Sequence, residues 1–148
     1  MNIGNHFFDT QQNTYVMGIL NVTPDSFSDG GKFNQLDSAL FQVEKLIDEG
    51  AHIIDVGGES TRPNHVMISV QEEIERVCPI IEAINRRFSI PISLDTYKSE
   101  VAEAGFIVGV HMINDIWGLK WDNRMVGVIA KYKGSCCLMY YSIVMYYQ

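Results

Sequence analysis

Five short apolar segments alternate along the chain with segments of helical periodicity. The apolar segments are residues 15–20, 53–56, 91–94, 111–113 and 135–139. The first has no polar face, as expected of a strand that is covered on both sides. Repeated strand–helix units with such strands predict a parallel sheet with right-handed crossovers.

The intervening segments carry helix signals of different strength. Between residues 36 and 47 apolar side chains recur at helical spacing, and Gly50 is a predicted stop. Ser69 and Glu72 predict a capping box for the second helix, and Pro79 is expected to kink or divide that helix. Segments 97–108 and 122–132 are weaker helices, predicted as much from their position as from their periodicity.

Polar residues or glycines directly follow the predicted strands. They are Asn21, the pair Gly57 and Gly58, Asp95 and Asn114. Because parallel strands end at a common rim, these residues are expected to meet there, which favours an α/β fold of the (β/α) barrel type. A doubly wound sheet is the alternative, and the order of elements alone does not exclude it.

Composition narrows the class of protein. The 148 residues carry a net charge of −7 and no basic cluster, which argues against nucleic acid as a partner. No signal peptide and no apolar run of membrane-spanning length is found, so no membrane association is expected. The three cysteines have no metal-ligand spacing, which predicts a reduced, cytoplasmic setting.

Four motifs occur in order between residues 15 and 139. They are NVTPDSFSDGG (21–31), DVGGESTRP (55–63), SLDTYKSEVAEA (93–104) and MINDIWG (112–118). Together they resemble the strand-end motifs of the dihydropteroate synthase family. The resemblance implies a TIM (β/α)8 barrel that condenses 6-hydroxymethyl-7,8-dihydropterin pyrophosphate with p-aminobenzoate to give 7,8-dihydropteroate and pyrophosphate in folate biosynthesis. It also implies a homodimer for the full-length protein.

The resemblance assigns roles to residues of all four motifs. Asn21 is the implied Mg²⁺ ligand, a neutral oxygen suited to an ion that keeps waters and meets substrate phosphate. Thr61 and Arg62 would bind the pyrophosphate, because a guanidinium forms paired hydrogen bonds with phosphate oxygens. Asp95 and Asn114 would bind the donor and acceptor edge of the pterin. The resemblance also implies that Ile116 and Met139 are neighbours of the pterin pocket, and that three loop residues help form the p-aminobenzoate site: Phe27, Asp29 and Pro63.

Purely structural roles for three of these residues remain as alternatives. Asn21 could merely cap a strand end, Arg62 could be a surface arginine in a turn, and Asp95 could be a helix N-cap. The functional interpretation predicts that Mg²⁺ and Arg62 neutralise the departing pyrophosphate while Asp95 favours the cation left on the pterin. The amine then attacks carbon.

The chain reaches only a fifth strand, whereas an eight-stranded barrel needs about 250 residues. We expect an N-terminal extension at 1–14, an incomplete pterin-binding domain at 15–139 and a divergent tail at 140–148, where Tyr140 replaces a family histidine. The family's second pterin aspartate, its lysine and its arginine have no counterpart here. We interpret the chain as truncated and doubtful in activity. The alternatives are a half-barrel that dimerises, a related pterin-binding methyltransferase and a non-catalytic fragment.

Overall fold

One parallel sheet of five strands organises the molecule. The computed structural model describes residues 1–23, 32–60 and 66–139. The strands lie side by side in chain order, without a reversal. They are β3 (Met17–Asn21), β4 (Ile53–Gly57), β5 (Ile92–Asp95), β6 (Met112–Asp115) and β7 (Ser135–Leu138). A doubly wound sheet would reverse its strand order at a switch point, so the observed order confirms the barrel-type prediction.

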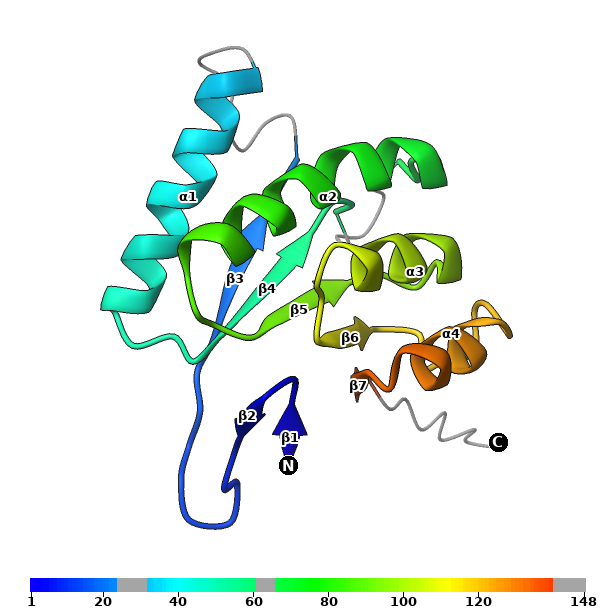
Figure 1. The fold of residues 1–148 in the computed structure, drawn as a ribbon. Helices are drawn as coiled ribbons and strands as arrows, with labels where there is room; N and C mark the ends of the chain where they lie inside the picture. The colour runs from blue at the N-terminus through cyan, green and yellow to red at the C-terminus, as the bar shows by residue number, and fades with distance from the viewer. Residues whose placement is uncertain (24–31, 61–65, 140–148) are drawn as a thin grey trace, which may run out of the picture.

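Four helices connect the strands and lie over one side of the sheet (Figure 1). They are α1 (Lys32–Asp48), α2 (Val70–Arg87), α3 (Ser99–Ile107) and α4 (Met125–Tyr132). Each follows its strand around the sheet, as expected of repeated βα units. Within the described residues, β3 and β7 each pair with one neighbour only. The chain thus folds as about half of a (β/α)8 barrel.

Local sequence signals explain the longest helix, α2. Ser69 caps it, because the Ser69 side chain accepts a hydrogen bond from the Glu72 backbone N–H at 3.1 Å. The Glu72 carboxylate pairs with Arg76 instead of returning to the cap. The helix runs unbroken through Pro79, so the expected division is wrong. A proline removes one backbone donor, and the buried Val77 and Ile81 on either side hold the helix against the sheet.

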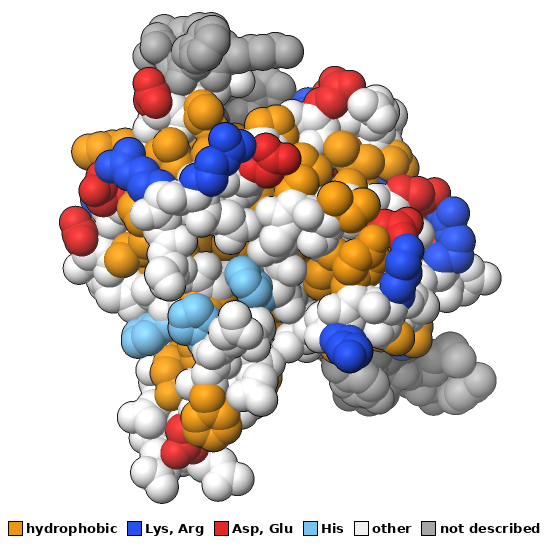
Figure 2. Space-filling view, viewed as in Figure 1, with side chains coloured by type: hydrophobic (Ala, Val, Ile, Leu, Met, Phe, Trp, Pro, Cys, Tyr) orange, Lys and Arg blue, Asp and Glu red, His pale blue; other side chains and the backbone are white. Residues whose placement is uncertain are grey.

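Two apolar clusters pack on opposite faces of the sheet. The larger joins the helices to the alternate strand residues that face them; its members on the strands include Leu20, Ile54, Val56, Ile92, Leu94 and Ile113. The smaller cluster lies on the other face and consists of buried Ile3, Phe8, Ile53 and Met112. Acidic and basic side chains are interspersed over the helices in the view of Figure 2. None of the helices in the described ranges is long and apolar enough to cross a membrane.

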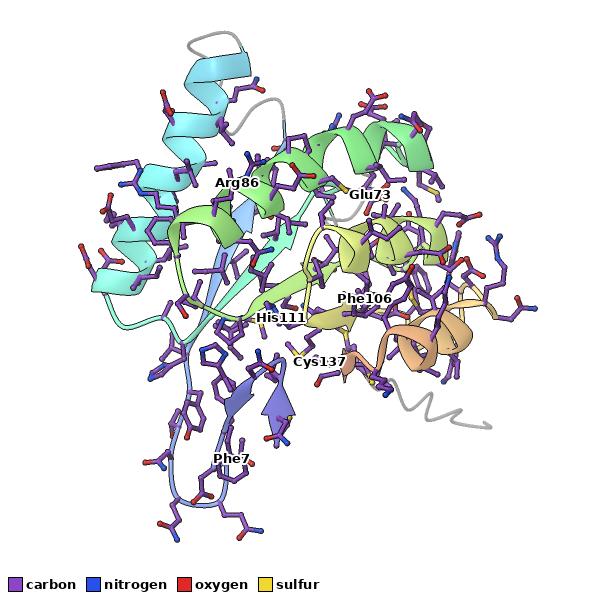
Figure 3. The ribbon with its side chains drawn as sticks, in the orientation of Figure 1. Phe7, Glu73, Arg86, Phe106, His111 and Cys137 are labelled. Carbon is purple, nitrogen blue, oxygen red and sulfur yellow. The ribbon has the colours of Figure 1, made fainter. Side chains whose placement is uncertain are left out.

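A short antiparallel hairpin closes the lower end of the second face. It consists of β1 (Asn2–Ile3) and β2 (His6–Phe7). It contacts the first residues of several strands: Ser135 Oγ donates to the Asn2 carbonyl at 2.7 Å, and Gly4 lies against the His111 ring. Figure 3 places His111 between the hairpin and the sheet. The proposed division of the chain after residue 14 stays a prediction.

Candidate functional site

Four residues at the carboxyl ends of neighbouring strands form one row across the sheet. Asn21 is paired with Gly57, Gly57 with Asp95, and Asp95 with Asn114. This is the convergence that the sequence predicts. Paired residues point to the same side of a sheet, so the three side chains share the face that the helices leave uncovered.

Gly57 leaves a space between the side chains of Asn21 and Asp95. A Cβ at Gly57 would lie 3.7 Å from Asn21 Oδ1, 3.7 Å from Asp95 Cβ and 3.8 Å from Asp95 Oδ2. These are ordinary contact distances, so a methyl group would fill the space without a clash. Because Gly57 has no side chain, an atom of a flat ligand can approach the row at this position.

Asn114 is held from below by a buried acid. Its Nδ2 donates to Asp55 Oδ2 at 2.9 Å. Because β5 lies between the strands of these two residues, the hydrogen bond crosses that strand. Asp55 is only 4% exposed. Asp55 Oδ1 and the Oγ of its cross-strand neighbour Ser93 are also buried, and neither makes a hydrogen bond of good geometry within the described residues.

The site has an acidic electrostatic environment. Burial raises the pKa of Asp95 to about 7, and the nearby carboxylates of Asp55, Glu73, Asp115 and Glu59 contribute to the increase. Burial also raises the pKa of Asp55, although the Ser93 hydroxyl and the Asn114 amide offset part of this effect. At neutral pH Asp95 therefore exchanges between its charged and neutral forms.

This arrangement suits a flat, polar heterocycle. A carboxyl group and two carboxamides offer acceptors and donors within one open row. For a metal ion, Asn21 provides one exposed neutral oxygen at the rim. No group of three His, Cys, Asp or Glu side chains that could hold a metal occurs in the part of the chain that the structure describes. One protein oxygen fits a Mg²⁺ ion that takes its other ligands from water and phosphate.

The remaining predicted site residues have different standings. Ile116 is half-buried and follows β6 directly. Met139 follows β7; its backbone N–H donates to the Asp115 carbonyl at 3.2 Å, and its side chain is exposed. These two residues therefore lie at the same rim, but their roles stay predictions. Five further predicted residues lie outside the described residues: Phe27, Asp29, Thr61, Arg62 and Pro63.

A buried ionic cluster beside the rim has no counterpart among the predicted site residues. Lys98 Nζ contacts Glu59 Oε2 and Glu73 Oε2, each at 2.6 Å, and donates to the Ile68 carbonyl at 2.9 Å. Tyr97 donates its hydroxyl proton to Glu59 Oε1 at 2.6 Å. Glu73 comes from α2 (Figure 3). Glu59 and Lys98 stand inside the second and third motifs, but no sequence spacing shows that they meet Glu73.

Two open hollows lie beside the row in the described structure. One open hollow of about 630 Å³ lies between β3 and α1 and includes Asn21. Another, of about 730 Å³, lies beside α3 and α4 and is lined by residues that include Lys98, Trp121 and Arg124. Neither hollow includes Asp95 or Asn114. An open sheet does not surround its uncovered face, so the row of polar side chains, not an enclosed cavity, marks the candidate site.

Comparison with known proteins matches the chain to one family. Residues 17–144 match the family described as pterin binding enzyme. The chain is 58% identical over 140 residues to dihydropteroate synthase of Clostridium beijerinckii, covering 95% of this chain and 52% of that protein. It is 53% identical over 130 residues to dihydropteroate synthase of Bacillus subtilis, covering 88% and 46%.

Solved structures agree. The crystal structure of a Clostridium difficile dihydropteroate synthase in the presence of pteroic acid superimposes with a TM-score of 0.88 at 51% identity, covering 95% of this chain and 54% of that one. A Xanthomonas albilineans dihydropteroate synthase with 4-aminobenzoic acid gives a TM-score of 0.86 at 38% identity, covering 97% and 52%. The chain thus spans about half the length of the relatives that it matches. The chain therefore belongs to the pterin binding enzyme family, and the relatives named here are dihydropteroate synthases.

Proposed function

We propose that this chain provides the first strand-end motifs of a dihydropteroate synthase. In the proposed reaction, the amine of p-aminobenzoate replaces pyrophosphate on the methylene carbon of 6-hydroxymethyl-7,8-dihydropterin pyrophosphate, in folate biosynthesis. The observation that carries the proposal is the row of Asn21, Asp95 and Asn114 at one end of the sheet, in register and open over Gly57. Complete turnover is proposed only for a protein of the relatives' full length, which is about twice the length of this chain.

Asp95 and Asn114 are the proposed pterin ligands. A pterin presents adjacent ring N–H, amino and carbonyl groups, which a carboxylate and a carboxamide can match. An analogue without these groups would leave polar atoms of the site unpaired, and this provides the selectivity. Ile116 and Met139 would contact the ring beside this edge.

Asn21, Thr61 and Arg62 are the proposed groups for the pyrophosphate end. Asn21 would contribute one oxygen to a Mg²⁺ ion, and that ion, when bound, neutralises negative charge on the phosphate oxygens. Arg62 would bind the same leaving group through paired hydrogen bonds, with the Thr61 hydroxyl beside it. Phe27, Asp29 and Pro63 would contribute to the p-aminobenzoate site.

A dissociative order of steps follows from the chemistry of the substrates. An aromatic amine is a weak nucleophile, so the carbon–oxygen bond to pyrophosphate breaks first, and the electron pair leaves with the pyrophosphate. The pterin carries the resulting positive charge, which the ionised form of Asp95 stabilises. The amine nitrogen then bonds to the methylene carbon and releases a proton.

Two further properties belong to the same proposal. We infer a cytoplasmic location, which is supported by three cysteines that are all free thiols, Cys78, Cys136 and Cys137. We also infer that the complete protein is a homodimer.

Calorimetric titration of the chain with 6-hydroxymethylpterin tests the proposal. Wild type is expected to bind, and Asp95→Asn and Asn114→Ala are each expected to weaken binding by about tenfold or more, because each removes a partner of the ring. Glu103→Gln is the control, since Glu103 pairs with Lys131 on the helix face. Absence of heat with wild type, or wild-type affinity in Asp95→Asn, would overturn the assignment.

A further inference from the structure

The contact between Asp55 and Asn114 joins two strands that do not pair with each other. Asp55 lies on β4 and Asn114 on β6, with β5 between them. Asp55 is paired with Ser93 and Asn114 with Asp95, so the 2.9 Å hydrogen bond crosses β5 between the strand-end row and the level just below it. Asp55 is buried, whereas Asn114 is half-buried and reaches the open face.

The chemistry of this contact specifies one orientation of the Asn114 amide. An ionised carboxylate only accepts hydrogen bonds, so it requires the nitrogen of Asn114 and not the oxygen. With Nδ2 committed to Asp55, Asn114 retains Oδ1 as an acceptor and one N–H as a donor. A carboxamide without such a partner has two orientations of similar shape, which exchange the positions of donor and acceptor.

We propose that Asp55 is a positioning residue of the strand-end site, which fixes the Asn114 carboxamide in one orientation and thereby sets which of its atoms meet the ligand. The effect on ligand binding rests on the proposed pterin function, whereas the hydrogen bond between Asp55 and Asn114 does not depend on it. Asp55 lies below the row of Asn21, Asp95 and Asn114, and it acts through Asn114. Buried partners of this kind hold functional side chains in one rotamer, and a small loss of orientation weakens binding.

The competing explanation is that Asp55 only fills space in the sheet. Asparagine at position 55 distinguishes the two explanations, because it has nearly the same shape but offers both an acceptor and a donor to Asn114. It would accommodate either orientation of the Asn114 amide. Alanine at position 55 would remove the partner altogether.

The first test measures the Asn114 side chain in the absence of ligand, by NMR of the ¹⁵N-labelled chain. The Asn114 amide signals are identified by their loss in Asn114→Ala. In wild type, exchange of the hydrogen-bonded proton with solvent is expected to be at least about tenfold slower than in Asp55→Ala. Ser93→Ala is the matched control: it removes the neighbouring buried hydroxyl, but it leaves the Asp55–Asn114 hydrogen bond in place. Equal exchange in wild type and Asp55→Ala would overturn the inference.

The second test measures affinity for 6-hydroxymethylpterin by calorimetry. Asp55→Asn is expected to weaken binding by about fivefold to tenfold, whereas Ser93→Ala stays within about twofold of wild type. Wild-type affinity in Asp55→Asn would show that the residue fills space and would overturn the inference, even where Asp55→Ala fails to fold. If wild type binds no pterin, the proposed function fails, and the exchange measurement alone decides the role of Asp55.

Discussion

Asp95 shows how one residue can be valuable for binding and costly for folding. Its carboxyl group is half-buried beside four other acids, and its pKa lies near 7 instead of the ordinary 3.8. Because the folded state binds the proton more tightly than the unfolded state, stability falls as pH rises from about 4 to 7. Functional sites commonly retain such unfavourable groups.

Replacing Asp95 by asparagine is therefore expected to stabilise the chain while it weakens pterin binding. The gain in the free energy of unfolding should be roughly 1 to 3 kcal/mol at pH 8. Most of it should be lost at about pH 3.5, where the folded wild type is protonated and the unfolded wild type is mostly protonated. Urea unfolding at the two pH values measures this difference. A variant that is less stable than wild type at pH 8 would contradict the assigned pKa.

Asp122→Asn is the matched control and should behave in the opposite way. Hydrogen bonds from Arg124 and from the Ser99 backbone hold the pKa of Asp122 well below its usual range. The stability that Asp122 contributes is present above the ordinary pKa and is lost as pH falls through the lower folded value. Asp122→Asn should therefore destabilise the chain at pH 8, and the loss should shrink in acid.

At the scale of elements, the Lys98 cluster joins three parts of the fold. Glu59 follows β4, Glu73 lies in α2, and Lys98 precedes α3. The Lys98 side chain is 9% exposed, and both carboxylates are more deeply buried. Glu59 also accepts from the Ile68 backbone N–H at 3.1 Å. The cluster thus ties both ends of the segment from Glu59 to Ile68 to the start of α3.

Lys98→Met is expected to lower the free energy of unfolding by about 3 kcal/mol, because it leaves two buried carboxylates without their cation. Lys131→Met is the matched control: it breaks the exposed pair with Glu103 and should change stability little. Urea unfolding of both variants at pH 7 measures the difference. Equal effects would mean that the Lys98 cluster is no stronger than a surface pair.

The cluster also predicts a pH dependence. Burial opposes the ionisation of Glu59, but hydrogen bonds from Lys98 and Tyr97 hold its pKa below the ordinary 4.5. Burial likewise opposes the charge on Lys98, but Glu59 and Glu73 raise its pKa above 10.5. The Glu59 contribution is lost as pH falls through its lowered pKa, and the Lys98 contribution is lost as pH rises through its raised pKa. The difference in the free energy of unfolding between wild type and Lys98→Met should therefore be largest between about pH 5 and pH 10. Urea unfolding of both proteins at several pH values across and beyond this range measures it.

Comparison of sequence and structure shows which elements local signals can predict. The strands and the Ser69 cap follow from apolar runs and from one hydroxyl at a helix start, both of which are local. Strand ends could be predicted for the same reason, and with them the row of Asn21, Asp95 and Asn114. The Lys98 cluster could not, because its members are 25 and 39 residues apart and their contact depends on how the helices pack. The partner of Asp55, 59 residues away, is of the same kind.

At the scale of the whole molecule, the uncovered face of the sheet has three levels. The strand-end row lies at the top, the buried pair Asp55 and Ser93 lies one level below it, and Ile53 of the hairpin's apolar cluster lies at the lower end. Met112 of the same cluster is paired with Ser93, so the cluster reaches up to the middle level. The hairpin reaches β4, β6 and β7 through Ile53, Met112 and Ser135. Because it contacts strands from both halves of the sheet, its loss should destabilise the sheet as a unit.

Gly4→Ala tests this role of the hairpin, and Gly127→Ala in α4 is the control. The two substitutions are expected to change the free energy of unfolding in opposite directions. Gly4 has a φ of +57°, and a Cβ there would lie 2.2 Å from His111 Cδ2, while the His111 ring is held by the Ile92 backbone N–H. Gly4→Ala should therefore lower the free energy of unfolding by about 2 kcal/mol. Gly127 lies exposed in α4, and beyond its chain neighbours and the backbone of its own helix nothing lies within 4 Å of a Cβ built there. Gly127→Ala should therefore raise the free energy of unfolding by up to about 1 kcal/mol. Thermal unfolding monitored by the circular dichroism of the helices reports on the sheet and its helices together. A lower midpoint in Gly4→Ala therefore means that the hairpin stabilises the entire fold. An unchanged midpoint in Gly4→Ala, beside a raised one in Gly127→Ala, would mean that the hairpin opens on its own and leaves the sheet intact.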